Sequence, residues 1–448
     1  MGESLTESRT ETTLPAPGGQ RAEPWHPAGS PHRRGLVTAR RGSRPEPAEA
    51  HEAVVLLERA RAEVDPVLRA AIDSLPGPMR RVALHHFGWD RADGFPGRSG
   101  SGKGRPVMGG SGNGGQDKGG PGNGGPGRGG SGKGRPVMGG PANGGQDKGG
   151  PANGSPGKGG SGSAIRPALV LVAAAALGGS EARARAVRAA AAVELVHHCT
   201  LLHDDTMDRD AVRRHRPTAW TVFGDADAIL AGDALQALAL RLLAEDPHPA
   251  SSAAAARLAD CVVELCAGRH ADTAMERRGP GEVTLDEVLA MAEAKTGALL
   301  GGACAIGALY AGAGAADVAA LDAFGREAGL AFQLIDDVIG LWGDPGRTGK
   351  PVGADPAARS KSLPVVAALT SGSPEAAGLA ELSARPGGKV DLEHLALTVE
   401  RAGGRDWAQE QAADRMARAV QQLARAVPDP EAAGGLLALA ESVTRRGS

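Results

Sequence analysis

Aromatic side chains are nearly absent from this chain of 448 residues. Phe, Trp and Tyr together make up 2% of it, whereas hydrophobic residues as a whole make up 41%. Any core must therefore be built from Ala, Leu and Val, and Ala and Leu are among the best helix formers. This composition predicts an all-α protein.

Charge of one sign and paired cysteines are also lacking. The formal net charge is −2, which does not supply the basic surface needed to bind a phosphate backbone, so we expect no nucleic-acid partner. The four cysteines form no CxxC pair, and a chain of this length needs no disulfides to hold its core. We therefore expect a cytoplasmic protein.

Long apolar runs are missing as well. The first 20 residues are acidic and polar and contain no apolar segment. No stretch reaches the roughly 18 apolar residues that span a bilayer. The sequence thus predicts neither export nor membrane insertion.

Four segments are expected along the chain. Residues 1–45 carry six prolines and no periodicity, which is typical of a disordered tail. Residues 46–98 should form the first helices of the fold, with two helices between Pro47 and Gly88. Residues 163–448 are a succession of Ala- and Leu-rich segments, expected to form the helical catalytic core, with two or three helices after Leu392. The apolar positions at helical spacing in the first pair are Val54, Leu57, Val64, Val67, Leu68 and Ile72.

The remaining segment, residues 99–162, is a glycine-rich repeat. Ser101–Gly130 is nearly copied in Ser131–Gly160, and glycine fills 27 of these sixty positions. Such a stretch cannot offset its ordering entropy by burying side chains, so we expect a flexible loop inserted into the fold. Because the repeat has eight Lys or Arg against two Asp, the loop, like the tail, is a candidate for docking an unknown partner.

Two acidic motifs carry the expected chemistry. Asp204 and Asp208 are four residues apart, so on a helix they share one face with His197. Asp336 and Asp337 follow an otherwise apolar helix, with Gln333 one turn upstream. A lone DDxxD is more often a solvated helix face, but two such motifs favour a common site.

Carboxylates gathered at one site need cations between them. Two carboxylates about 5 Å apart repel by about 3 kcal/mol at an effective dielectric constant of 20. Carboxylate and phosphate oxygens are ligands that Mg²⁺ prefers, and cationic side chains that suit diphosphates follow each motif. These cations are Arg213, Arg214, Lys295, Lys350 and the Arg359–Lys361 cluster.

Over about residues 50–445 the chain resembles the trans-isoprenyl diphosphate synthase (polyprenyl synthetase) family, with the repeat as an insertion. The resemblance implies an isoprenoid synthase bundle of helices around a central cavity, with the two aspartate motifs facing each other across its mouth, and an expected homodimer. The segments that carry it, in chain order, are IRPAL (Ile165–Leu169), HDDTMD (203–208), RRHRPT (213–218), GDAL (Gly232–Leu235), Lys295–Thr296, FQLIDD (332–337) and GKP (Gly349–Pro351).

The resemblance also assigns a role to each candidate residue. Isopentenyl diphosphate and an allylic diphosphate would be the substrates, joined with the help of about three Mg²⁺ ions. Arg213, Lys295 and Lys350 would grip the allylic diphosphate, and Thr296 and Gln333 would lie beside the reacting carbons. Isopentenyl diphosphate would be held by Arg166, His197 and Arg214, and Mg²⁺ by Asp204, Asp208 and Asp336, supported by Asp205 and Asp337.

Several positions depart from the family pattern. Ser163 and Ser360 stand where lysines are expected, Arg269 where a glutamine is expected, and Gly340 where the second motif has its third aspartate. Arg359 and Lys361 flank Ser360 and are candidates to replace its lost charge. These departures leave open a regulatory diphosphate-binding subunit without turnover. A class I terpene cyclase is a further alternative, although DDVIG replaces the second metal motif such an enzyme would carry.

Product length is expected to follow from the helix that carries Asp204. One helical turn rises 5.4 Å, close to the length of one isoprene unit. The growing tail would pass Thr200, Val196 and Val193, with Cys199 alongside. In the family, short-chain enzymes often carry an aromatic plug four or five residues before the first aspartate. Cys199 and Thr200 are both small, which predicts C20 as the main product, with some C25 possible, over C15.

Overall fold

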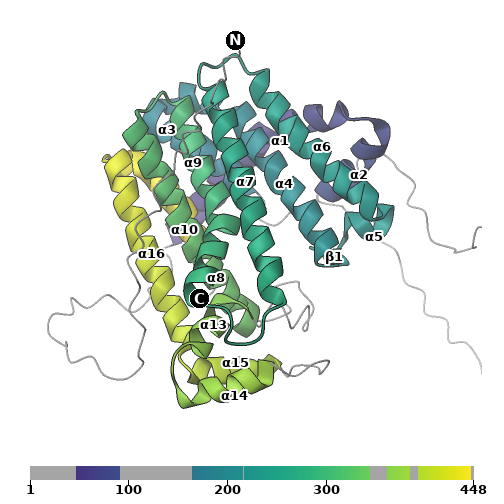
Figure 1. Cartoon of the computed structure of the whole chain (residues 1–448). Helices are drawn as coiled ribbons and strands as arrows, with labels where there is room; N and C mark the ends of the chain where they lie inside the picture. Colours follow the sequence, from purple (N-terminus) through teal and green to yellow (C-terminus); the bar gives the residue numbers. More distant parts are fainter. Residues whose placement is uncertain (1–46, 91–163, 215, 344–360, 384–391, 445–448) are drawn as a thin grey trace, which may run out of the picture. The chain divides into compact units, whose positions relative to one another are not determined.

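The computed structural model describes residues 47–90, 164–214, 216–343, 361–383 and 392–444 (Figure 1). The predicted tail, the whole of the predicted repeat insertion, Lys350 and the serines at 163 and 360 lie outside these residues. In the described part almost all regular structure is helical, as the composition predicts. The described residues all belong to one compact unit.

The two N-terminal helices form where the apolar spacing predicts them. Helix α1 spans Pro47–Asp73 and α2 spans Gly77–Phe87. Leu57, Val64 and Ile72 of α1 are each at most 5% exposed, whereas Val54, also predicted on the apolar side, is 41% exposed. Gly88 ends α2 in a left-handed conformation, with φ of +77°, which glycine adopts without steric cost.

Small residues allow the central helices to pack closely. Helix α4 (Val187–Met207) is preceded by α3 (Ile165–Arg185) and packs against α3 and α6 (Asp225–Ala244). The four alanines 189–192 of α4 are all fully buried. A Cβ added to Gly325 would lie 2.5 Å from the carbonyl oxygen of Leu300, so glycine is required where α10 (Ala315–Trp342) meets α9 (Ala298–Tyr310).

Figure 1 shows α4, α7, α9 and α10 running side by side through the bundle. Helix α7 spans Ser251–Glu276, and α8 (Leu285–Ala292) continues into the π-helical segment η2 (Glu293–Gly297), which leads directly into α9. The short helix α5 (Ala219–Phe223) packs on α6. A hairpin of two-residue strands, β1 (Val212–Arg213) and β2 (Arg216–Pro217), lies between α4 and α5 in sequence.

The C-terminal part contributes five helices in the described ranges. Helix α13 (Leu363–Leu369) packs against α16 (Gly404–Ala426), which itself lies along α10. Helices α14 (Pro374–Ser383) and α15 (Leu392–Arg401) contact each other, and α17 (Pro430–Thr444) returns to α3 and α1. Three helices after Leu392 agree with the sequence prediction.

Two helical stretches are long and apolar enough to cross a membrane, Ile165–Arg185 and Leu285–Tyr310. This differs from the expectation that no such run exists. In their most apolar windows, 56% and 67% of the residues are buried inside the protein. Core helices of soluble proteins pass the same test, so these stretches are weak evidence for a membrane span.

Candidate functional site

The first aspartate motif lies at the end of α4. The helix ends at Met207, and Asp208 is its C-cap residue, with its N–H donating to the carbonyl oxygen of Asp204 at 2.8 Å. The side chains of Asp204 and Asp208 both reach the guanidinium of Arg269 on α7. Two carboxylates of the motif therefore converge on a single positive charge.

An ion-pair chain continues from this point to the π-helical segment. Arg269 Nη1 lies 3.1 Å from Asp272 Oδ2, and Lys295 Nζ donates to the same oxygen at 2.6 Å. Asp272 thus links the first motif to Lys295. Sequence reasoning missed Asp272, although its spacing of three residues from Arg269 on one helix face was a usable signal.

Asp205 pairs with a different arginine. Its side chain is 2% exposed, and Arg213 Nε donates to its Oδ1 at 2.6 Å. Burial raises the pKa of Asp205 to about 6, although the Arg213 charge and hydrogen bond lower it. The other oxygen, Oδ2, is buried without a hydrogen-bond partner in the described structure. Asp205 therefore fixes the hairpin that carries Arg213 against α4.

The hairpin turn stores local backbone strain. Arg213 pairs with Arg216 across β1 and β2, and Arg214 in the turn has φ of +50°. This left-handed conformation is uncommon for a residue with a Cβ. Such outliers gather at functional sites, and here the outlier lies within the pair of predicted diphosphate ligands, Arg213 and Arg214.

The π-helical segment η2 positions Lys295 and Thr296. Thr296 Oγ1 donates to Gln333 Oε1 at 2.8 Å, and Gln333 Nε2 donates to Asp337 Oδ1 at 2.8 Å. The N–H of Leu363 donates to the other carboxylate oxygen of Asp337 at 2.9 Å. Insertions of π-helix into α-helices are frequent at functional sites. The structure therefore joins predicted residues from η2 and from the second motif in one hydrogen-bonded chain.

The two aspartates of the second motif differ in their surroundings. Asp337 is partly buried, and burial raises its pKa to about 6 against the hydrogen bonds from Leu363 and Gln333. Asp336 is exposed. Among the described residues no three acidic, His or Cys side chains are close enough to hold a metal by themselves. The structure does not bring Asp336 together with Asp204 and Asp208 as a protein-only cage.

Lys361 does not fill the role suggested for it. Its side chain is almost fully buried, and Nζ donates to the carbonyl oxygens of Arg278 at 2.7 Å and Gly279 at 2.9 Å. Those contacts hold the segment just before α13 against the residues that follow α7. The idea that Lys361 supplies the cation missing at Ser360 is therefore wrong for this arrangement, because its ammonium already serves a structural purpose.

Arg166 and His197, both predicted to bind isopentenyl diphosphate, are in direct contact. Arg166 Nη1 lies 3.1 Å from His197 Nε2. Arginine is only a donor, so the ring nitrogen accepts and the imidazole is neutral. Burial, followed by the charge of Arg166, holds the pKa of His197 well below its usual value. Nε of Arg166 is buried without a hydrogen-bond partner in the described structure.

Behind this pair lies a buried polar cluster that the sequence did not reveal. His198 Nδ1 is 2.9 Å from His86 Nε2, and Phe87 stacks on the His198 ring. Glu194 Oε1 is 3.4 Å from His198 Nε2, and the Glu194 side chain is 5% exposed. Burial raises the pKa of Glu194 to about 7 and lowers that of His198 to about 3. Burial therefore favours the neutral form of both side chains.

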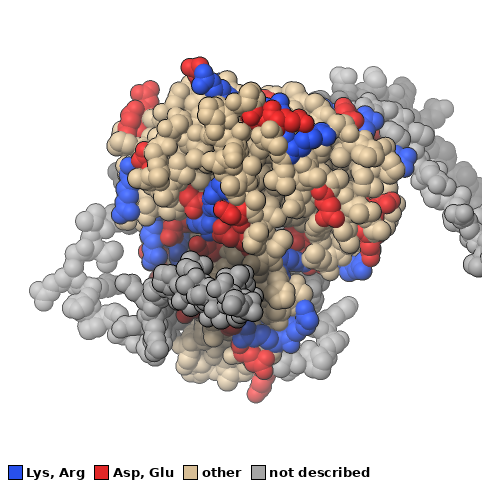
Figure 2. Space-filling view, turned by 45° about the horizontal axis from the view of Figure 1, so that its top comes forward, with Lys and Arg blue, Asp and Glu red and all other residues tan. Residues whose placement is uncertain are grey.

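Other arginines in the described part are paired with carboxylates. Arg257 and Arg326 both bind Asp322 and Glu264 across α7 and α10. Figure 2 shows one face of the molecule, on which basic and acidic side chains lie beside each other and neither sign dominates. Arg166 differs from these arginines because no carboxylate pairs with it among the described residues.

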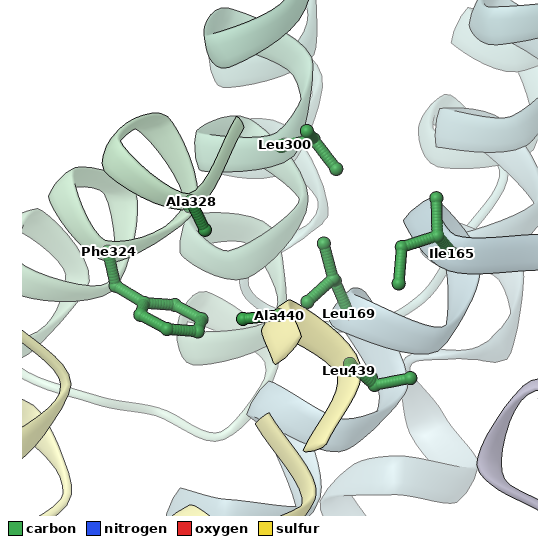
Figure 3. Close-up of a pocket in the computed structure, with 8 residues that line it drawn as sticks. Ile165, Leu169, Leu300, Phe324, Ala328, Leu439 and Ala440 are labelled. Atoms are coloured by element: carbon green, nitrogen blue, oxygen red, sulfur yellow. The ribbon is translucent and has the colours of Figure 1, made fainter. Parts of the chain in front are cut away.

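A small apolar cavity lies between α3, α9, α10 and α17 (Figure 3). One of its lining residues, Leu300 of α9, comes four residues after Thr296 in the chain. None of its lining residues comes from α4, the helix whose residues are predicted to set the length of the product. Its lining consists of Ile165, Leu169, Leu300, Phe324, Gly325, Ala328, Leu439 and Ala440.

Comparisons with known proteins point to one family. The model of the polyprenyl synthetase family matches residues 158–395. A geranylgeranyl diphosphate synthase of Mycobacterium tuberculosis is 41% identical over 394 residues, which cover 87% of this chain and 93% of the relative. A (2E,6E)-farnesyl diphosphate synthase of Mycobacterium bovis is 45% identical over 276 residues, which cover 60% and 76% of the two chains. The solved polyprenyl synthetase of Streptomyces coelicolor A3(2) is 35% identical, covers 87% of this chain and 99% of its own, and superposes with a TM-score of 0.68.

Proposed function

Since the chain belongs to the polyprenyl synthetase family and is a prenyltransferase, we propose that it condenses isopentenyl diphosphate with an allylic diphosphate to a C20 product. One observation carries the proposal. Asp272 joins the aspartates of the first motif, through Arg269, to Lys295, whose neighbour Thr296 bonds to Gln333 of the second motif region. This arrangement suits a negatively charged substrate held together with cations.

The carboxylates at the site fit magnesium. Oxygens of Asp204 and Asp208 already converge on one cation, and Asp336 is exposed and thus accessible. Mg²⁺ is usually bound through one or two carboxylates, water and substrate phosphates rather than by an all-protein cage. We propose that Asp204, Asp208 and Asp336 hold about three Mg²⁺ ions with the allylic diphosphate. When bound, the metal would neutralise charge on the departing pyrophosphate.

The chain's own residues would orient the allylic substrate. Lys295 and Arg213 would contact its diphosphate, with Lys350 as a further predicted ligand outside the described residues. Thr296 and Gln333 are fixed by their mutual hydrogen bond, which would hold their oxygens beside the allylic cation formed on ionisation. Asp205 and Asp337, predicted to support the metal, would act through Arg213 and Gln333, the side chains they bind.

The isopentenyl side would use Arg166, His197 and Arg214. Arg166 supports this assignment because its guanidinium has no carboxylate partner in the described part of the chain, and its buried Nε is unpaired. A diphosphate would satisfy that donor. The isopentenyl double bond would attack the allylic cation, and the proton then lost would pass to the released pyrophosphate, so no side-chain base is needed.

The C20 length rests on the helix that carries Asp204. Cys199 is buried and Thr200 is half-buried. Because both side chains are small, neither places an aromatic ring below the aspartate. The relatives are named as geranylgeranyl and farnesyl diphosphate synthases, and the proposed length matches the first of them. We further propose a cytoplasmic homodimer without a nucleic-acid partner, in which the tail or the glycine-rich loop docks another molecule.

A product assay tests the function. The pure protein would be incubated with Mg²⁺, isopentenyl diphosphate and, separately, the C5, C10, C15 and C20 allylic diphosphates. Accumulation of a C20 diphosphate is expected with the shorter three. A cyclic hydrocarbon would instead identify a terpene cyclase. No product with any substrate, from protein that still binds a diphosphate, would identify a non-catalytic subunit.

A further inference from the structure

Arg269 contacts the two aspartates of the first motif that we propose as Mg²⁺ ligands. Its Nε lies 3.3 Å from Asp204 Oδ1, Nη2 contacts Asp208 Oδ1, and Nη1 lies 3.1 Å from Asp272 Oδ2. The Arg269 side chain is 14% exposed. One side chain on α7 therefore holds carboxylates from the body of α4, from its C-cap and from α7 itself.

A guanidinium in this place competes with a metal ion for the same oxygens. Arginine remains protonated at any pH the protein tolerates, so its charge cannot be removed to admit a metal. It must move instead. Its fit to Asp204 is imperfect, since Nε is buried yet makes no hydrogen bond. Asp272 gives it a place to remain paired after leaving the α4 aspartates.

Asp272 is held independently of the α4 aspartates. Lys295 Nζ donates to the oxygen that also faces Arg269, so the carboxylate keeps its position when the guanidinium swings. When the guanidinium moves, Arg269 loses its contacts with Asp204 and Asp208 and keeps its contact with Asp272. The family pattern leads us to expect a neutral glutamine at this position, and a neutral side chain would not compete with a metal ion for these carboxylates.

We propose that Arg269 is an internal counter-ion that occupies the metal-binding face of Asp204 and Asp208 in the free enzyme and weakens its binding of divalent cations. The proposal rests on the metal role of these aspartates given above. Arg269 is a positioning residue, because it acts on metal ligands and not on the reacting carbons. Its replacement should change metal affinity in the absence of any substrate.

The test is a titration of the full-length, metal-free protein with Mn²⁺, with free Mn²⁺ measured by electron paramagnetic resonance. Arg269→Gln should bind Mn²⁺ at least about tenfold more tightly than wild type, which corresponds to about 1.4 kcal/mol. The matched control is Arg209→Gln, which removes the same charge one residue after Asp208. Because Arg209 pairs with Asp225 instead, this variant should bind as wild type does.

Asp204→Asn separates failure of the inference from failure of the proposed function. If Asp204→Asn leaves Mn²⁺ binding unchanged, the metal role of the motif is wrong. If Asp204→Asn weakens binding while Arg269→Gln matches wild type or binds more weakly, the role of Arg269 alone is wrong. That role is also wrong if Arg209→Gln tightens binding as much as Arg269→Gln does.

Thermal unfolding supplies a second readout. Without metal, Arg269→Gln leaves Asp204 and Asp208 without their shared cation, so its midpoint should fall below that of wild type. Saturating Mn²⁺ should raise the midpoint of Arg269→Gln by more than it raises that of wild type, since tighter binding to the folded state stabilises it more. An equal rise in both proteins would count against the proposal. If Arg269→Gln does not fold, Arg269→Lys serves, because a single ammonium cannot reach three carboxylates, and Mn²⁺ binding several-fold tighter than wild type is expected.

Discussion

Replacing Glu194 by Gln should remove a loss of folding stability that wild type undergoes as the pH rises. Glu194 is buried on α4, its Oε1 is 3.4 Å from His198 Nε2, and its Oε2 has no hydrogen-bond partner in the described structure. Burial raises its pKa from 4.5 to about 7, although the charges of Arg166, Arg214 and Arg61 lower it. The folded protein therefore keeps this proton over a range in which the unfolded chain has lost it.

The sign and size of the effect follow from this difference. A raised carboxyl pKa makes the free energy of unfolding fall as pH rises, with the loss spread between the unfolded value near 4.5 and the folded value near 7. At 1.36 kcal/mol per pKa unit, the loss between pH 5 and pH 8 is about 2 to 3 kcal/mol. Glutamine has nearly the same shape and does not titrate. The stability of Glu194→Gln relative to wild type should therefore rise by that amount.

Neighbouring histidines change the free energy of unfolding with pH in the opposite direction, and a comparison with wild type removes their contribution. Burial lowers the pKa values of His86, His197 and His198, so the folded state resists their protonation and gains stability as pH rises toward their unfolded value near 6.5. Wild type and Glu194→Gln share these residues. The difference between the two proteins at each pH therefore isolates Glu194.

The assay is urea unfolding followed by circular dichroism at pH 5, 6, 7 and 8. Glu181→Gln is the matched control, because it makes the same replacement at a side chain that is 75% exposed and pairs with Arg185 at the surface. Exposed ion pairs contribute little to stability, so this variant should differ little from wild type in any of the four measurements. A Glu194→Gln difference that is also constant from pH 5 to pH 8 would refute the argument, since Glu194 would then be ionised in the folded protein throughout.

Three further predictions concern activity. Asp336→Ala should lower turnover by several orders of magnitude without shifting the thermal midpoint, because Asp336 is exposed and would lose only metal contacts; retention of a tenth of wild-type kcat would exclude that role. Ser163→Lys should lower KM for isopentenyl diphosphate, measured at saturating allylic substrate, through a contact of about 1.5 to 3 kcal/mol; an unchanged KM would mean that another cation already serves. Cys199→Phe should shorten the product to C15 or C10, as measured by mass spectrometry. The larger ring should lower the free energy of unfolding by about 1 to 3 kcal/mol, because Cys199 contacts Gln236. A product of wild-type length would mean that residues of another helix set the length.

The sequence was most informative where structure is local. The apolar spacing before Gly88 predicts α1 and α2, and the amphipathic segments after Leu392 predict α15, α16 and α17. A spacing of four residues is enough to place Asp204 and Asp208 near each other at a helix end. These features depend on residues within a few turns, which periodicity records directly.

The site contacts that were missed connect residues far apart in the chain. Arg269 and Asp208 are 61 residues apart, and no spacing within one helix can report that pairing. The sequence marked Arg269 only as a departure from a family pattern. The hairpin was missed for a different reason, because strands of two residues are too short to show alternation. The π-helical segment has no compositional signature that distinguishes it from α-helix.

The five aspartates predicted as metal ligands divide into two groups by what they already bind. Asp205 and Asp337 are partners of Arg213 and of Gln333 with the N–H of Leu363, so their carboxylates hold the hairpin and the start of α13 in place. Among the described residues, the carboxylates of Asp204 and Asp208 instead face the long, flexible side chain of Arg269, and Asp336 faces solvent. The first motif thus combines one aspartate that fixes the frame with two whose carboxylates can exchange a cation, and the second motif combines one of each kind. Asparagine at Asp205 or Asp337 would preserve most of the frame bonds, whereas asparagine at the other three would remove the charge that the proposed Mg²⁺ ions require.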